Sequence, residues 1–213
     1  MDDKFWCLKN CNLFTLLTSE RVERLESRSI TRKFERNSLI YLPSDHSESV
    51  LLLTAGGVKI SHLTGEGKQA LLAIIDPGEL FGELAIFDSG VREEFAEVME
   101  SSTVVMMIPG DEIQRPMEAH PNMSLGVTRL IDLRQRSVER RLKSLLFRSN
   151  RERLVHLLLE LAEKYGCSTR EGVFIGIKLS HQDLASIIGS TRETVTALLG
   201  ELQAGGDLTI KWR

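Results

Sequence analysis

Residues 180–204 read SHQDLASIIGSTRETVTALLGELQA, which forms two short amphipathic segments joined at Gly189. A capping box consists of Ser or Thr followed three residues later by an acidic or amide side chain, and it marks the start of a helix. Both segments open in this way: Ser180 is followed by Asp183, and Ser190 is followed by Glu193. Gly189 suits the sharp turn between them because it has no β-carbon. The stretch therefore predicts a helix-turn-helix.

Apolar side chains give each predicted helix one buried face. These residues are Leu184, Ile187 and Ile188 in the first helix, and Val195, Leu198, Leu199 and Leu202 in the second. The second helix begins with polar residues that we expect to face outward: Thr191, Arg192, Glu193 and Thr194. An arginine can donate to O6 and N7 of guanine, and a carboxylate can accept a hydrogen bond from the amino group of cytosine. Hydroxyl groups and the amides at a helix N-terminus suit phosphate oxygens.

We therefore expect the second helix to enter the major groove of double-stranded DNA. The expected DNA-binding residues are Ser180, Gln182, Thr191, Arg192, Glu193, Thr194 and Thr196. A plainer alternative is that Arg192 and Glu193 only pair with each other on a surface helix. A run of basic residues just upstream favours DNA binding over this alternative. The run consists of Arg134, Arg136, Arg140, Arg141, Lys143, Arg148, Arg151 and Arg153.

Residues 122–147 contain neither proline nor a long loop signal, so they can form one helix of about seven turns. Its narrow apolar seam consists of Ile131, Val138, Leu142 and Leu145. A long helix with a narrow seam needs a cover, and a symmetric homodimer supplies a second copy of the same helix. The alternative is that the seam packs against the rest of the same chain. A further helix is expected at residues 152–165, ended by Gly166.

The first half of the chain has the pattern of a β-structure. Residues 12–27 have the spacing of one short helix, and residues 29–109 then contain short apolar runs separated by turn signals. The runs are residues 38–42, 50–53, 58–60, 70–75 and 103–108. Strands spaced by about ten residues, with no long helix between them, predict a closed barrel or roll rather than a parallel sheet.

The composition limits the class of protein. The chain has 213 residues, a net charge of −3 and three cysteines, an odd number that argues against a disulfide framework and suits a reducing cytoplasm. No segment approaches the roughly 20 apolar residues that cross a bilayer, and the N-terminus lacks the order of a signal peptide. The sequence also lacks a nucleophile–base pair, a phosphate-binding loop and metal-ligand spacing. We therefore expect a cytoplasmic protein that is not an enzyme and needs no cofactor.

The chain resembles the CRP/FNR superfamily of bacterial transcription regulators over almost its whole length. The matching segments are residues 53–60 (LTAGGVKI), 77–85 (PGELFGELA), 180–185 (SHQDLA) and 189–195 (GSTRETV). The resemblance implies an α+β chain with a cyclic-nucleotide-binding-type β-roll of the jelly-roll class, a long dimerisation helix and a winged helix-turn-helix. It also implies that the dimer binds DNA and RNA polymerase, with Arg192 and Glu193 contacting bases. Ala197 replaces a further base-reading arginine of the member that binds cyclic AMP.

We expect residues 1–116 to form the roll, residues 117–147 the dimerisation helix and residues 148–213 the winged helix-turn-helix domain. The chain ends at Lys211-Trp212-Arg213, after the expected first strand of the wing and before a second one. A sensory protein that binds a protein partner and has lost DNA binding is therefore a further interpretation.

The resemblance also implies an effector pocket in the roll, but several positions depart from the family pattern. The pocket would contain Gly82, Glu83, Leu84, Arg92, Glu93, Glu94 and Val138. Glu93 and Glu94 fall where the family has a phosphate-binding Arg-Ser pair, and two carboxylates repel an anion. Val138 and Glu139 replace the hydroxyl residues that contact the purine. We therefore expect no dependence on cyclic AMP and an unknown effector, although a shifted loop would turn Arg92 inward.

Cys7 and Cys11 suggest an alternative, a redox- or metal-responsive regulator on the same scaffold. On a helix their spacing places both thiols on one face, where they could form a thiol switch or share a metal. A four-iron cluster normally needs four thiolates, and the third cysteine, Cys167, lies in the DNA-binding half. Two cysteines near an N-terminus are also often ordinary small apolar residues.

Overall fold

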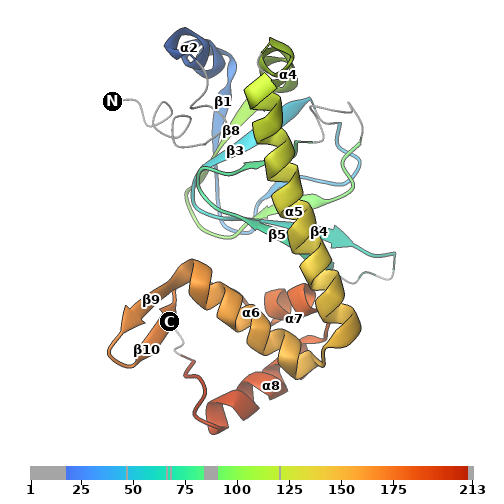
Figure 1. Cartoon of the computed structure of the whole chain (residues 1–213), viewed down its shortest axis with the longest axis vertical. Coiled ribbons are helices and arrows are strands. Elements are labelled where there is room, and N and C mark those ends of the chain that lie inside the picture. The colour runs from blue at the N-terminus through green and yellow to red at the C-terminus, as the bar shows by residue number, and fades with distance from the viewer. Residues whose placement is uncertain are drawn as a thin grey trace. The chain divides into compact units, whose positions relative to one another are not determined.

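The computed structural model describes residues 18–46, 48–65, 67, 69–83, 91–119 and 121–210 (Figure 1). The chain divides into two compact units, Met1–Gln135 and Arg136–Arg213. The long helix α5 (Pro121–Phe147) contributes residues to both units and confirms the single helix expected there. No helix in the described ranges is both long and apolar enough to cross a bilayer.

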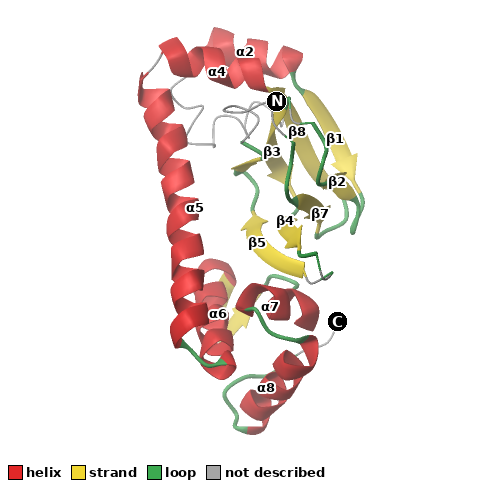
Figure 2. Cartoon of the chain, turned by 90° about the vertical axis from the view of Figure 1, so that its right-hand side faces the viewer, coloured by secondary structure: helices red, strands yellow, loops and turns green. Residues whose placement is uncertain are grey.

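The first unit is built on two four-stranded antiparallel sheets (Figure 2). Its elements are α2 (Ser19–Arg28), β1 (Ile30–Phe34), β2 (Leu39–Tyr41), β3 (Ser49–Ala55), β4 (Val58–Leu63), β5 (Gln69–Ile75), β6 (Leu80–Phe81), β7 (Phe95–Val98), β8 (Thr103–Pro109) and α4 (Gly110–Ala119). One sheet has the order β1-β8-β3-β6 and the other β2-β7-β4-β5, so strands far apart in the sequence lie side by side. These short antiparallel strands confirm the predicted jelly-roll-type β-roll.

Strand β3 shows why the apolar runs in this unit are continuous. Val50 and Leu52 pack into a cluster that includes residues of α2, α4 and the start of α5. Leu51 and Leu53 belong to a second cluster, which contains residues of both sheets. Successive side chains of a strand point to opposite faces. Because both faces of β3 are covered, the strand needs no alternating polar residues.

An ion-pair network joins α2 to α4. Nη1 of Arg28 lies 3.2 Å from Oδ2 of Asp111 and also pairs with Glu112, while Nη2 of Arg24 lies 3.3 Å from Oε1 of Glu112. Glu112 is only 5% exposed. Burial of its carboxylate is unfavourable, and the two arginines offset this cost by pairing with its negative charge. The helix expected at residues 12–27 corresponds to α2, and residues 12–17 of that prediction lie outside the described residues.

The second unit contains the end of α5 and a compact set of shorter elements. These are α6 (Asn150–Tyr165), β9 (Gly166–Thr169), β10 (Gly172–Ile175), α7 (His181–Ile188) and α8 (Arg192–Ala204). They confirm the helix expected before Gly166 and the two helices of the helix-turn-helix. Helix α6 starts earlier than expected, because Ser149 is its N-cap and forms a capping box with Glu152.

The sequence pattern does not predict the β9–β10 hairpin, which projects from the end of α6 (Figure 1). A β-carbon at Gly166 would lie 2.0 Å from the carbonyl oxygen of Ala162 and 2.7 Å from Cγ1 of Val173. Gly166 therefore allows the hairpin to fold closely onto the helix end. Residues 208–210 form no strand, and residues 211–213 lie outside the described part, so the expected wing strand is not formed by the described residues.

Candidate nucleic-acid interface

Helix α7 begins and ends with the signals that the sequence predicts. The hydroxyl of Ser180 accepts a hydrogen bond from the backbone N–H of Asp183 at 3.0 Å, and Oδ2 of Asp183 accepts from the backbone N–H of Ser180 at 2.9 Å. At the other end, Gly189 adopts the left-handed conformation with φ 65°. The predicted residues Leu184, Ile187 and Ile188 form its buried face. The capping box and the turn are therefore confirmed.

The prediction of a capping box between Ser190 and Glu193 is wrong by one residue. The N-cap of α8 is Thr191, whose hydroxyl accepts from the backbone N–H of Thr194 at 3.2 Å. The physical reason lies in the preceding turn, where the N–H of Ser190 still bonds to the carbonyl oxygen of Ala185. Ser190 therefore belongs to the C-terminal turn of α7, and α8 starts one position later than expected.

Helix α8 has one buried side and one open side at its first turns. Val195, Leu199 and Leu202 are buried, and Leu198 is half-buried. Of the expected DNA-binding residues, Thr194 is half-buried, and the following are exposed: Ser180, Gln182, Thr191, Arg192, Glu193 and Thr196. The exposed groups come from the N-terminal parts of α7 and α8.

A contact that the sequence does not predict joins these two helix ends. Nδ1 of His181 lies 2.8 Å from the hydroxyl of Thr196, and the same hydroxyl donates to the carbonyl oxygen of Arg192 at 2.8 Å. A hydroxyl has one hydrogen, so Thr196 accepts from His181 when it donates to Arg192. His181 therefore positions the start of α7 against α8. The two residues are 15 positions apart, and no spacing rule in the sequence connects them.

The Glu193 carboxylate is held in its ionised form. Its pKa is lowered by a backbone hydrogen bond, by the hydroxyl of Thr191 and by the charge of Arg192. An ionised carboxylate is a hydrogen-bond acceptor only, as contact with the amino group of cytosine requires. Among the described residues, no salt bridge joins Arg192 to Glu193. Arg192 and Glu193 therefore do not form a salt bridge with each other, and Glu193 already accepts hydrogen bonds within its own exposed turn.

In the roll, the side chain of Arg92 points inward. Arg92 is 7% exposed, donates from Nη2 to the carbonyl oxygen of Ser49 at 3.1 Å, and lies 3.9 Å over the ring of Tyr41. A β-carbon at Gly82 would lie 2.4 Å from Nη1 of Arg92. The inward position of Arg92, which the sequence allowed only for a shifted loop, is therefore the one observed.

The two neighbouring carboxylates of the expected pocket lie in different surroundings. Glu93 is exposed, whereas Glu94 turns inward, with Oε1 at 3.4 Å from the hydroxyl of Tyr41. Burial raises the pKa of Tyr41, and the charge of Glu94 raises it further. Arg92 and Glu94 thus bring opposite charges to the same ring. Glu83 is half-buried, and Leu84 lies outside the described residues.

The predicted seam of α5 is exposed along its length. The exposed fractions of its side chains are 38% for Ile131, 57% for Val138, 55% for Leu142 and 41% for Leu145. Cys7 and Cys11 lie outside the described residues. Within those residues, no three His, Cys, Asp or Glu side chains are grouped so that they could hold a metal ion.

Comparison with known proteins agrees with this architecture. Residues 31–120 match the cyclic nucleotide-binding domain family, and residues 152–211 match the Crp-like helix-turn-helix domain family. A global nitrogen regulator from Synechocystis sp. is 31% identical over 182 residues, which cover 85% of this chain and 81% of the relative.

Solved structures share the fold. The c-di-GMP-responsive global regulator CLP from Xanthomonas campestris aligns with a TM-score of 0.76 at 21% identity, covering 92% of this chain and 96% of that chain. A transcriptional regulator of the CRP/FNR family from Thermus thermophilus aligns with a TM-score of 0.69 at 25% identity, covering 86% of this chain and 90% of that chain. These similar proteins are regulators. The chain belongs to the CRP/FNR family of transcription regulators and carries a DNA-binding helix-turn-helix domain.

Proposed function

We propose that two copies of the chain form a homodimer that places the first turn of each α8 in a major groove of double-stranded DNA. The observation that carries this proposal is that the first turn of α8 has one exposed side and one buried side. Arg192 and Glu193 are exposed, whereas Val195 is fully buried. The buried side holds the helix to its domain, so the two charged side chains project from a fixed backbone.

Each expected contact has a chemical role. Arg192 donates to O6 and N7 of a guanine, and Glu193 accepts from the amino group of a cytosine. The hydroxyl and amide side chains act on the phosphate backbone, which positions the helix without reading sequence. These positioning residues are Ser180, Gln182, Thr191, Thr194 and Thr196. Thr196 already donates within the chain, so its contact to a phosphate requires the release of that bond.

The exposed seam of α5 supports the homodimer. Val138 and Leu142 are more than half exposed, and an uncovered apolar stripe of this kind is unfavourable in water. Pairing with a second copy removes this surface from water and contributes on the order of 1 kcal/mol for each such side chain. The dimer then presents two copies of α8 to two half-sites with centres about 34 Å apart.

The roll works without cyclic AMP in this proposal. Arg92 is engaged by Ser49 and Tyr41 of the chain itself, and Val138 lacks a hydroxyl for a purine. The regulator acts in the cytoplasm, where it also contacts RNA polymerase. Its proposed domains are the roll at residues 1–116, the segment 117–147 that contains the dimerisation helix α5 (Pro121–Phe147), and the DNA-binding domain at 148–213.

Selection of bound sequences from random duplex DNA tests the proposal with the full chain. We expect a two-fold symmetric site, and an affinity that falls steeply with salt because phosphate contacts release counterions. Saturating cyclic AMP leaves the affinity for that site unchanged. Binding with no sequence preference at low salt would refute the proposal, as would a selected site without two half-sites.

A further inference from the structure

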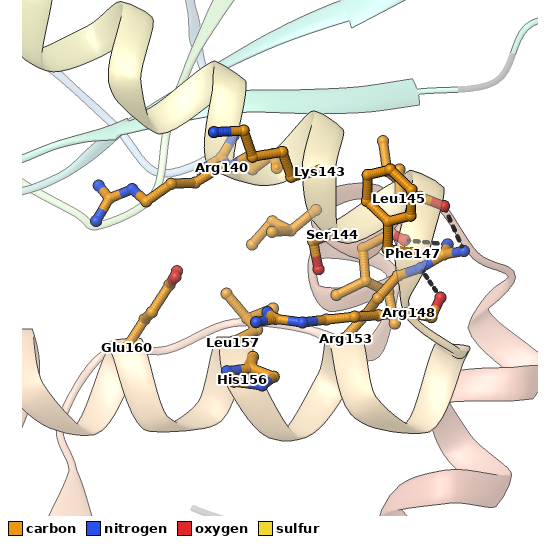
Figure 3. Close-up of a pocket in the computed structure, with 13 residues that line it drawn as sticks. Arg140, Lys143, Ser144, Leu145, Phe147, Arg148, Arg153, His156, Leu157 and Glu160 are labelled. Atoms are coloured by element: carbon orange, nitrogen blue, oxygen red, sulfur yellow. Dashed lines mark hydrogen bonds between the residues drawn. The ribbon is translucent and has the colours of Figure 1, made fainter.

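The second unit contains a cavity of about 360 Å³ between the last turns of α5 and the facing side of α6, with the end of α7 as a third wall (Figure 3). Its basic and acidic lining residues are Arg140, Arg141, Lys143, Arg148, Arg153 and Glu160, and His156 also lines it. Five arginine or lysine side chains therefore line it together with one carboxylate, although the net charge of the chain is −3. This local excess of cations favours an anionic occupant.

One cation of this cavity lies where its charge is disfavoured. Burial lowers the pKa of Arg141, the carboxylate of Glu160 opposes this effect, and the charge of Arg140 adds to it. An anion beside a partly buried guanidinium offsets the cost of keeping it charged. The surroundings of Arg141 therefore favour an anionic occupant.

Arg153 has a different role from the other cations. Its guanidinium donates from Nε to the carbonyl oxygen of Arg148 at 2.9 Å, from Nη2 to that of Leu145 at 3.1 Å and from Nη1 to that of Ile188 at 3.1 Å (Figure 3). These carbonyls belong to the last turn of α5, to the residue that follows α5 and to the end of α7. Arg153 thus connects α6 to both helices, and its bonds to the backbone leave ligand binding to the other basic residues.

We propose that this cavity binds a small organic phosphate. Arg140, Lys143 and Arg148 supply charge-assisted hydrogen bonds to the phosphate oxygens, and a guanidinium can bind two of them at once. Leu157 and Ile187 provide an apolar wall for the rest of the ligand. The volume lies at the lower end of the range for ligand pockets, which favours a molecule of about the size of one nucleotide.

Ligand binding at this place is coupled to DNA binding, and this part of the inference rests on the proposed function. Ile187 and Ile188 line the cavity and lead directly into Gly189, the turn before α8. A β-carbon at Gly189 would lie 2.7 Å from Cδ2 of Leu145, so the turn also packs closely on α5. A ligand that prefers one arrangement of these helices changes the affinity for DNA by the ratio of its affinities for the arrangements.

Calorimetric titration of the full chain without DNA tests the site, with ADP and inorganic pyrophosphate as probes. We expect saturable binding of one ADP per chain in this cavity. The double variant Arg140→Ala/Lys143→Ala weakens binding about tenfold or more, because charge-assisted hydrogen bonds are lost. The matched control is Arg170→Ala, which removes an exposed arginine from the turn between β9 and β10 and leaves binding unchanged. Adenosine, which has no phosphate, binds far more weakly than ADP.

The same variants distinguish a small phosphate from the phosphates of DNA. If Arg140 and Lys143 contact DNA instead, the double variant weakens DNA binding without ligand and reduces its salt dependence by about one unit for each lost contact. The inference is overturned if the double variant weakens DNA binding in this way and the wild type binds neither ADP nor pyrophosphate at millimolar concentration. Equal affinity of wild type and double variant for ADP also overturns it. ADP binding lost in the double variant, in a chain that does not bind DNA, supports the site and refutes the proposed function.

Discussion

Nη1 of Arg153, on α6, lies 3.1 Å from the carbonyl oxygen of Ile188, the last residue of α7. The carbonyls at a helix C-terminus have no partner within the helix, so a side chain from another helix can satisfy them. The same guanidinium also donates to the carbonyl oxygens of Leu145, in the last turn of α5, and of Arg148, which follows that helix. One side chain therefore sets the place of the helix-turn-helix relative to the last turns of α5.

The variant Arg153→Ala should lose about 1–3 kcal/mol of unfolding free energy, because it leaves backbone carbonyls without their donor. Arg153→Lys should lie between wild type and Arg153→Ala, since an ammonium group cannot reach three separated carbonyls with the geometry of a guanidinium. Urea unfolding followed by circular dichroism measures both variants. The exposed Arg170→Ala is the control for loss of charge. An Arg153→Ala protein as stable as this control would show that the three bonds contribute nothing.

Gly189 allows a second test of the turn. Its φ of 65° disfavours any residue with a β-carbon, and that atom would also lie 2.7 Å from Cδ2 of Leu145. We expect Gly189→Ala to destabilise the chain by about 1–3 kcal/mol. Gly200 is the matched control, because it lies within α8 with open space around its β-carbon position. Gly200→Ala should stabilise the helix by roughly 0.5–1 kcal/mol. The same sign of change at both glycines would contradict the account.

The start of α8 can be located by comparing two neighbouring residues. Thr191→Ala removes the N-cap and should lower the unfolding free energy by about 1 kcal/mol. Ser190→Ala should have little effect, because the hydroxyl of Ser190 does not cap the helix. Thermal or urea unfolding of the two variants side by side gives the answer. A larger loss for Ser190→Ala than for Thr191→Ala would place the cap where the sequence pattern alone predicts it.

Glu152 gives a prediction for pH. Hydrogen bonds from Ser149 lower its pKa below the ordinary value of 4.5. A carboxyl group with a lowered pKa in the folded state stabilises the protein above its unfolded-state pKa, and this stabilisation is lost as the pH falls through the folded-state pKa. The stability difference between wild type and Glu152→Gln should therefore be constant above about pH 5 and shrink below the ordinary value. A difference that grows on acidification below about pH 4 would have the wrong sign.

The elements with strong local signals could be predicted from the sequence. Strands β3 and β8 are long apolar runs, and the caps at Ser180 and Gly189 depend only on near neighbours. Strand β1 (ITRKF) has no buried residue, and β6 is two residues long, so neither has a pattern to detect. The hairpin β9–β10 is exposed along most of its length, so it also lacks a pattern of buried residues that could be detected in the sequence.

The residues of the candidate sites also differ in whether their positions can be predicted from the sequence. The exposed Arg192 and Glu193 follow from the periodicity of α8 alone. The inward position of Arg92 depends on the path of its loop and on contacts with Ser49 and Tyr41, which are more than 40 positions away. The contact between His181 and Thr196 likewise requires the packing of two helices. Tertiary contacts of this kind have no period in the sequence.

The most direct test of the central claim compares the affinity for the selected DNA site with that for a site in which one guanine is replaced at the position assigned to Arg192. For wild type we expect a difference of about 1–3 kcal/mol, and for Arg192→Ala almost none, with similar affinity of both proteins for unrelated DNA. Gly200→Ala serves as a folded control within the same helix. An Arg192→Ala protein that retains the full preference for guanine, or that loses affinity equally for every sequence, would contradict base reading by the first turn of α8.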